Sequence, residues 1–303
     1  MHMRLGGNIE WKEHLASKEP VPPEEQSIKN GTLSFSSVFQ GNKAKLELFA
    51  AGTYTGGLNP KSSLSSVKMC LVSDHHTFEV GDVSFQAPDL ALYSSGRRGV
   101  RYKLSLKNFE ASAFLLSTQQ LSGLGLPSSN SNMRGGTIKL KLGSLVLRSL
   151  FLTGKDDPSL GVNQANLIST VRKGSIFSFG GSLNLHNKLK VEGDYFLSSY
   201  DNDISDKEKA KRDSAIVIRG SFNNNIINLS GEWRRIGLNY NSVGTTMISN
   251  NQTSFVGNMA LSFSKLLISS SVNYLKSNIA SVRNIPESQN LTFDTIQGQL
   301  LSV

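Results

Sequence analysis

The sequence predicts an all-β protein: an antiparallel, up-and-down transmembrane β-barrel of about sixteen strands. Two observations predict this fold. Segments that alternate apolar and polar residues recur along the chain, and the connections between them alternate between very short and long. A barrel that crosses an outer membrane has short turns at one end and long loops at the other, whereas a soluble sandwich has no reason to keep its long loops at one end. We expect the barrel to be complete or to be part of a larger one.

Seven short polar turns are each flanked by alternating segments, which is the pattern of a tight β-hairpin. They are Gln40-Gly41-Asn42, Asp74-His75, Lys107-Asn108, Gly143-Ser144, Asn187, Asn224-Asn225 and Lys265. Long connections rich in Ser, Asn and Gly separate them. They cover residues 55–63, 86–97, 119–133, 154–173, 200–212, 241–252 and 277–289.

The segments between these connections are predicted strands. They span residues 4–11, 32–39, 43–54, 64–73, 76–85, 98–106, 109–118, 134–142, 145–153, 174–186, 188–199, 213–223, 226–240, 253–264, 266–276 and 290–302. Many have roughly 9 to 13 residues, enough to cross a bilayer at a tilt near 45°. The Pro-rich stretch from Lys12 to Gly31 is predicted to be an exposed loop or linker. Residues 1–31 are therefore a candidate first strand plus this loop, and residues 32–303 form the barrel domain.

Composition excludes several classes of protein. The chain has 303 residues, of which 38% are hydrophobic, and it has no apolar run of about 18 residues, which excludes a helical membrane protein. A β-barrel passes this test because only alternate residues of each strand face lipid. The net charge of +9 would suggest nucleic acid for a soluble protein. However, the basic residues are scattered along strands, so we expect no nucleic-acid partner. The single Cys70 makes an intramolecular disulfide impossible.

Alternation assigns two faces to several strands. A charged residue on the lipid face at mid-bilayer would cost about 2 to 4 kcal/mol, so the charged positions must face inward. The candidate lumen-lining residues are Lys139, Lys141, Lys190, Glu192, Glu232 and Arg234. In the alternative interpretation the apolar faces form the dry core of a soluble sandwich or solenoid. Against it, a sandwich would need shorter strands, and no fixed-length repeat supports a solenoid.

No motif predicts catalysis. His75 and His76 are adjacent, so they would point to opposite faces of a strand, and they fall in a predicted tight turn. Acidic residues in the long loops, such as Asp201 and Asp203, fit no EF-hand spacing and are expected to be solvated. No Gly-x-Ser-x-Gly elbow and no phosphate-binding glycine loop is present. We therefore expect no enzyme activity, no cofactor and no metal, although barrel-shaped hydrolases exist.

Three stretches are more specific than the alternating pattern of a β-barrel requires. They are Gly81-Asp82-Val83-Ser84-Phe85 followed by Ser95-Gly96-Arg97-Arg98-Gly99-Val100; Val191-Glu192-Gly193-Asp194-Tyr195; and Gly231-Glu232-Trp233-Arg234-Arg235 running into Tyr240-Asn241-Ser242-Val243-Gly244. Together they resemble the large, poorly characterised outer-membrane β-barrel proteins of Gram-negative bacteria. The resemblance covers about residues 76–280 and implies fold and location, with no activity attached. The chain departs from it at Ser249-Asn250-Asn251-Gln252, where an acidic residue is expected, and it lacks a terminal aromatic residue.

A rim cluster is predicted around the Gly-Arg-Arg-Gly segment. The glycines allow a strand to bend or bulge, and the cluster would set guanidinium groups beside a carboxylate at the barrel rim or wall. Its members are Asp82, Arg97, Arg98 and Arg101. Two interpretations stay open: a structural bulge with a salt bridge, or a charge cluster that tunes selectivity.

These observations predict a porin-like channel for passive passage of small polar solutes across the bacterial outer membrane. Basic lumen residues would mildly favour anions. Its partners would be outer-membrane lipid, the solutes and other envelope proteins. The alternatives are a non-transporting surface, secretion or adhesion barrel, and a soluble extracellular β protein. Residues Met1 to Leu5 show no apolar segment or cleavage site of a secretory signal, so such a signal is expected to have been removed or to lie upstream.

Overall fold

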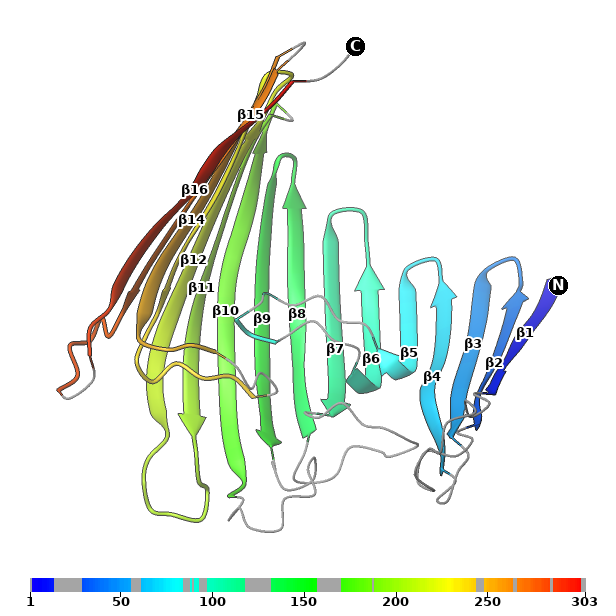
Figure 1. Cartoon of the computed structure of the whole chain (residues 1–303). Helices are drawn as coiled ribbons and strands as arrows, with labels where there is room; N and C mark the ends of the chain where they lie inside the picture. The colour runs from blue at the N-terminus through cyan, green and yellow to red at the C-terminus, as the bar shows by residue number, and fades with distance from the viewer. Residues whose placement is uncertain are drawn as a thin grey trace, which may run out of the picture. The chain divides into compact units, whose positions relative to one another are not determined.

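A computed structural model of the chain describes residues 2–13, 29–55, 61–83, 88, 90–92, 97–117, 132–156, 170–186, 188–243, 248–263, 266–283 and 286–300. Across these residues, sixteen strands form one sheet whose order follows the chain (Figure 1). The strands are β1 His2–Glu13, β2 Lys29–Gln40, β3 Ala44–Thr55, β4 Lys61–Ser73, β5 His76–Val83, β6 Arg97–Ser105, β7 Phe109–Ser117, β8 Asn132–Leu142, β9 Leu145–Asp156, β10 Arg172–Leu185, β11 Leu189–Asp201, β12 Lys211–Asn223, β13 Ile227–Ile236, β14 Gln252–Ser262, β15 Leu266–Ser277 and β16 Gln289–Leu300.

The connections alternate in length, as the sequence predicts. Each even-numbered strand joins the next strand through two or three residues, at 41–43, 74–75, 106–108, 143–144, 186–188, 224–226 and 263–265. The connections that follow odd-numbered strands are longer, and neighbouring strands run antiparallel. In the turn between β8 and β9, Gly143 has φ of 62°, which glycine adopts without strain. The predicted up-and-down topology is therefore confirmed. The turn residues Asn187 and Lys265 lie outside the described residues.

Several strand boundaries differ from the predictions by a few residues, and those of β1, β2 and β13 are instructive. Residues 12–13 and 29–31, predicted to be irregular, extend β1 and β2 and pair with each other in register. In the opposite direction, β13 ends at Ile236 and not at Tyr240. The cause is Asp213 of the neighbouring strand β12, whose Oδ2 accepts the backbone N–H of Asn239 at 2.8 Å. A side chain at Gly237 would collide with that carboxylate, so glycine lets the chain leave the sheet there.

The described strands belong to two compact units. The first contains Met1–Gln86, Ser94–Leu106 and Ser112–Arg134, and the second contains Ala87–Tyr93, Lys107–Ala111 and Gly135–Val303. In the first unit, Leu71, Phe78 and Tyr102 lie side by side across β4, β5 and β6 and are exposed. Cys70 and Glu79 face the other way and are buried.

The second unit has an exposed apolar face. Phe151, Phe177 and Leu197 lie opposite one another across β9, β10 and β11, and their exposed fractions are 51%, 46% and 47%. Trp233 of β13 lies on the same face of the sheet and pairs with Phe255 of β14. We call this surface of β9 to β15 the apolar face and the other surface the opposite face. Large apolar side chains left in contact with the surroundings on one whole face indicate an apolar environment there.

The core of the second unit lies on the opposite face, in the half of the strands nearest the long connections. Its buried sheet residues are Leu150, Leu152, Ile176, Phe196, Ala215 and Val217. Two loop segments pack with this core, Leu90–Leu92 from the β5–β6 connection and Tyr240–Val243 from the β13–β14 connection. Tyr240 meets Phe196 edge-on, with ring centroids 6.4 Å apart.

Gly174 of β10 makes room for this packing. A methyl group there would lie 2.6 Å from Cδ2 of Tyr200 and 2.7 Å from Cγ2 of Val243. We expect Gly174→Ala to lower the free energy of unfolding by about 1 to 3 kcal/mol, because overpacking forces these side chains apart. Heat-induced unfolding of the purified protein, followed by circular dichroism, measures the change. Gly193→Ala is the matched control, since nothing lies within 4 Å of that position; equal effects at the two glycines would contradict the packing argument.

Candidate functional site

A network of charged side chains covers the opposite face of β9 to β13, on the side of the core toward the short turns. The strand register builds it. Arg148 and Asp194 both lie opposite Gly180, from β9 and β11 respectively. One step along the strands, Arg219 of β12 lies between Glu192 and Glu232. Side chains that share one register row on one face are close enough to pair.

The Arg148–Asp194 pair spans an entire strand. Arg148 donates from Nε to Oδ1 of Asp194 at 2.8 Å and from Nη2 to Oδ2 at 2.6 Å, a bidentate geometry. The two residues can meet because Gly180 lies between them. A Cβ at that position would lie 2.1 Å from Oδ1 of Asp194. The Asp194 side chain is only 2% exposed, and removing its partner would leave a buried carboxylate unpaired.

The network continues through Arg219 and Glu232. Arg219 Nη1 lies 3.8 Å from Oδ2 of Asp194, and its Nε donates to Oε2 of Glu232 at 2.5 Å. Arg234 donates to the other oxygen of the same carboxylate. Beside these residues, Lys190 Nζ lies 2.5 Å from Oε1 of Glu192. Cations and carboxylates from β9, β11, β12 and β13 therefore alternate across this face, with Gly180 of β10 between them.

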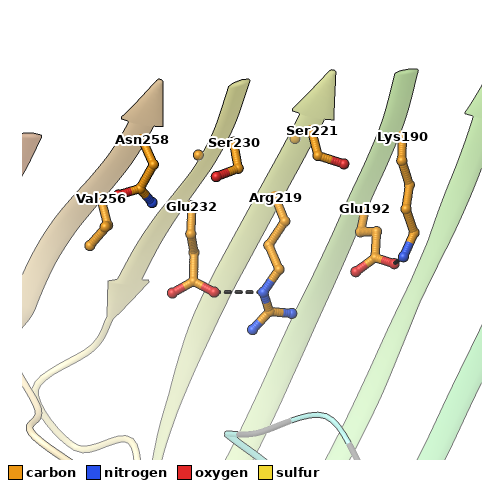
Figure 2. A pocket seen from close by; sticks show the side chains of 10 residues that line it. Lys190, Glu192, Arg219, Ser221, Ser230, Glu232, Val256 and Asn258 are labelled. Atoms are coloured by element: carbon orange, nitrogen blue, oxygen red, sulfur yellow. Dashed lines mark hydrogen bonds and ion pairs between the residues drawn. The ribbon is translucent and has the colours of Figure 1, made fainter. Parts of the chain in front are cut away.

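An open pocket lies on this face between β11 and β14. Figure 2 shows the side chains of Arg219 and Glu232 pointing toward one another beside the Lys190–Glu192 pair. The pocket is lined by Lys190, Glu192, Arg219, Gly220, Ser221, Ser230, Gly231, Glu232, Val256 and Asn258. Hydroxyl, amide, carboxylate and ammonium groups together can bind water and polar solutes of either charge.

The structure brings together four of the six predicted lumen-lining residues: Lys190, Glu192, Glu232 and Arg234. The other two are on β8, where Ile138 and Leu142 are exposed at alternate positions and Lys139 and Lys141 therefore face the opposite way. Lys141 Nζ lies 3.2 Å from Oε1 of Glu110.

Sequence reasoning missed three members of the network: Arg148, Asp194 and Arg219. Arg148 lies between Leu147 and Ser149, Asp194 between Gly193 and Tyr195, and Arg219 between Ile218 and Gly220. The same alternation that selected Lys139 could have selected them. The alternation gives the face of each residue but not the register between strands, and the register decides that these three charged side chains meet.

Sequence reasoning also missed the contact between two distant connections. The hydroxyl of Tyr240 donates to the carbonyl of Leu90 at 2.9 Å, and the hydroxyl of Ser242 donates to the carbonyl of Ala91. Burial raises the pKa of Tyr240, so its phenol stays a neutral donor at physiological pH. A signal was present in Leu150-Phe151-Leu152, where continuous apolar residues predict burial on both faces.

The predicted rim cluster divides between two carboxylates. Arg98 donates from Nε to Oδ1 of Asp82 at 3.0 Å, while Oδ2 of Asp82 accepts the backbone N–H of Val67 at 2.8 Å. Arg101 instead pairs with Glu79, whose other oxygen lies 3.4 Å from Nζ of Lys68. Arg97 lies opposite Val83 in the register.

A left-handed backbone conformation at Gly81 of β5 accompanies the Asp82–Arg98 pair. Gly81 has φ of 99°, and a Cβ there would lie 2.1 Å from the carbonyl oxygen of Val67. Its register partner Gly99 is equally close to the backbone of Leu115. Such crowding requires glycine at both positions. The Asp82–Arg98 salt bridge is thus present, and the register of β5 with β6 runs without a shift through Gly81. A bulge and a role in selectivity stay predictions.

Among the described residues, no group of three His, Cys, Asp or Glu residues could hold a metal ion. The same residues contain no helix that is long and apolar enough to cross a membrane. In the β11–β12 connection, hydrogen bonds from Ser205 lower the pKa of Asp203, and the Asp201 carboxylate accepts the backbone N–H of Asp203. These carboxylates shape the loop as Asx turns do.

We expect Arg148→Met to lower the free energy of unfolding by about 3 to 5 kcal/mol, because it leaves the buried Asp194 carboxylate without its main partner. The double variant Arg148→Met/Asp194→Leu should recover most of that loss. Denaturant unfolding of the four proteins of the cycle measures the coupling. Lys45→Met removes one partner of an exposed pair, in which both side chains are 42% exposed, and should change stability by less than about 1 kcal/mol. Additive effects of Arg148 and Asp194 would contradict the pairing.

No protein-family model matches the chain, and no curated protein sequence matches it either. Solved structures match its fold. OccK5 (OpdH) of Pseudomonas aeruginosa superposes with a TM-score of 0.53 at 11% identity over 95% of this chain and 82% of that chain. OmpT, an outer membrane protein of Vibrio cholerae, superposes with a TM-score of 0.52 at 13% identity over 95% of this chain and 92% of that chain. An anion-selective porin from Comamonas acidovorans superposes with a TM-score of 0.50 at 11% identity over 91% of this chain and 89% of that chain. At these identities the likeness shows the fold, which is the antiparallel up-and-down β-barrel of about sixteen strands.

Proposed function

We propose that this protein is a bacterial outer-membrane β-barrel that forms a channel for passive passage of small polar solutes. The observation that carries the proposal is the division between two faces of one sheet. In β9 to β13 the apolar face exposes Phe151, Phe177 and Leu197, and the opposite face holds an ion-paired network. A membrane barrel needs this arrangement, with lipid outside and water inside. The fold shared with an anion-selective porin supports it.

The charged network would line the lumen. The predicted residues Lys139, Lys141, Lys190, Glu192, Glu232 and Arg234 would be joined there by Arg148, Asp194, Arg219 and Glu110. Six of these ten side chains are cationic and four are carboxylates. The excess favours anions mildly, while the alternating signs provide partners for solutes of either charge. We propose no enzymatic role, because the network offers ion pairs and no nucleophile beside a base.

The loop contact favours a second candidate, a barrel that does not transport. Tyr240 and Ser242 fasten Leu90–Leu92 to the opposite face, so these segments would occupy part of the lumen. If they narrow the lumen, the protein conducts small solutes only. If they close it, the barrel serves as a surface or assembly component. Conductance separates the two.

We expect the purified protein to form persistent, ohmic channels in planar lipid bilayers, because ion-paired strands keep the lumen open without a trigger. Current recorded in molar potassium chloride measures the conductance, and liposome swelling with sugars of increasing size measures the solute limit. Protein that inserts into the bilayer, as shown by resistance to carbonate extraction, yet passes no current would support the closed barrel and contradict the channel.

Glu232→Gln should raise the anion-to-cation permeability ratio by a factor of roughly 5, because a unit charge about 8 Å from a permeating ion in water contributes about 0.5 kcal/mol, with opposite sign for anions and cations. Reversal potentials in a potassium chloride gradient report the ratio. Glu208→Gln makes the same charge change at a carboxylate whose side chain is 71% exposed in the β11–β12 connection, and should leave the ratio nearly unchanged. A ratio that moves equally in both variants would remove Glu232 from the lumen.

A further inference from the structure

The apolar face of the second unit ends in a row of cations. On β9 to β13 this face is formed by the alternate positions that share a side with Phe151, Phe177, Leu197, Ile216 and Trp233. Its charged members are Lys155, Lys173, Asp201, Arg212 and Arg235, which are the last or second-to-last positions of that face in their strands. All five lie at the ends that lead into the long connections. We call Lys155, Lys173, Arg212 and Arg235 the cation row.

The other end of the same face carries no charge. At the short turns the corresponding positions are Leu145, Leu185, Leu189, Phe222 and Ile227. The cation row is therefore a property of one boundary of the apolar face and not of strand ends in general. A solvated sheet edge would have no reason to keep charges at one end only.

Spacing places the cation row just beyond the apolar band. A strand rises about 3.3 Å per residue, so residues 177 to 185 of β10 cover roughly 26 Å along the strand, or about 20 Å across a membrane at a tilt near 40°. Between Phe177 and Lys173 lies a single position of the apolar face, Ser175, beside Thr153 and Ser199. The order apolar, hydroxyl, cation matches the order hydrocarbon, interface, phosphate across a leaflet.

Two members of the row oppose each other directly. Lys155 of β9 is the register partner of Lys173 of β10. Like charges directly opposite on one face of a sheet are destabilising, and an anion between them removes the penalty. Asp201, on the other side of Lys173, is a nearby carboxylate, but its Oδ1 already accepts the backbone N–H of Asp203 at 3.1 Å. Arg212 lies opposite Ser199, and Arg235 lies opposite Ile216.

We propose that the cation row binds the phosphate groups of an anionic lipid in the leaflet that surrounds the long connections, with one phosphate between Lys155 and Lys173. Arg212 and Arg235 extend the same positive boundary over β12 and β13. The inference rests on the membrane location in the proposed function, and it assigns to the protein a lipid contact that channel activity does not require.

The test uses the full chain in nanodiscs of phosphatidylcholine with increasing phosphatidic acid, whose phosphomonoester is the probe. Native mass spectrometry counts retained phosphatidic acid, and the midpoint of thermal unfolding reports stabilisation. We expect wild type to retain the lipid, and Lys155→Gln/Lys173→Gln to weaken retention by about thirtyfold, since each cation near an anionic surface contributes about a fivefold factor. Lys43→Gln/Lys188→Gln removes two exposed lysines from short turns at the other end and should retain the lipid as wild type does.

Further arms separate the alternatives. Inorganic phosphate at millimolar concentration should not stabilise the protein; equal stabilisation would show a site for free phosphate and overturn the lipid assignment. Asp201→Asn should preserve or strengthen retention, because it removes a competing carboxylate; loss of retention would show that lipid binding needs the Lys173–Asp201 pair and would overturn a site made of the cation row alone. Equal retention by wild type and Lys155→Gln/Lys173→Gln would overturn the proposal. Because the assay reads lipid and not current, a protein that retains lipid but does not conduct refutes the channel alone.

Discussion

The two faces of a strand must suit two different surroundings, and the rest of this structure depends on that constraint. Side chains alternate from face to face, so a strand that exposes Phe177 and Phe179 on one side has only the intervening positions for polar groups. Ionised residues are thereby confined to one surface across several adjacent strands. Confinement brings Asp194 into contact with Arg148, a residue 46 positions away in sequence. The charge network is thus a consequence of apolar requirements on the other face.

In the half nearest the long connections, the opposite face carries apolar residues that must be kept from water. Phe196 and Ile176 belong to the apolar core of this face, and uncovered they would lose roughly 25 cal/mol for each Å² left in water. Two loop segments cover them, and polar anchors fix those segments. The Tyr240 hydroxyl binds the Leu90 carbonyl, so the backbone groups brought into the core are not left without partners. Glycines at 174 and 180 supply the space, one for the loop packing and the other for the ion pair.

Local patterns predicted the strands and turns because a period of two and a tight turn are properties of neighbouring residues. The prediction failed at β13, where Asp213 of another strand ends the ladder at Gly237. It also failed to single out Arg148, since one arginine between Leu147 and Ser149 shows the same local pattern whether it is paired or solvated. Register links these positions, and register is fixed by many pairings at once. The contact between Tyr240 and Leu90 joins residues 150 positions apart, beyond the reach of any local pattern.

The sheet carries charged side chains on both faces, and the two sets differ in whether a side chain of opposite charge lies beside them. On the opposite face Arg148, Lys190, Arg219 and Arg234 each have a carboxylate within hydrogen-bonding or ion-pairing distance, so these charges are balanced within the sheet. At the boundary of the apolar face, Lys155 and Lys173 face each other with like charge. The sequence places carboxylates beside the cations of the opposite face, and acidic residues could in the same way lie beside Lys155 and Lys173. Like charges kept in direct register beside exposed apolar side chains are therefore best explained by a counter-charge that the surroundings provide.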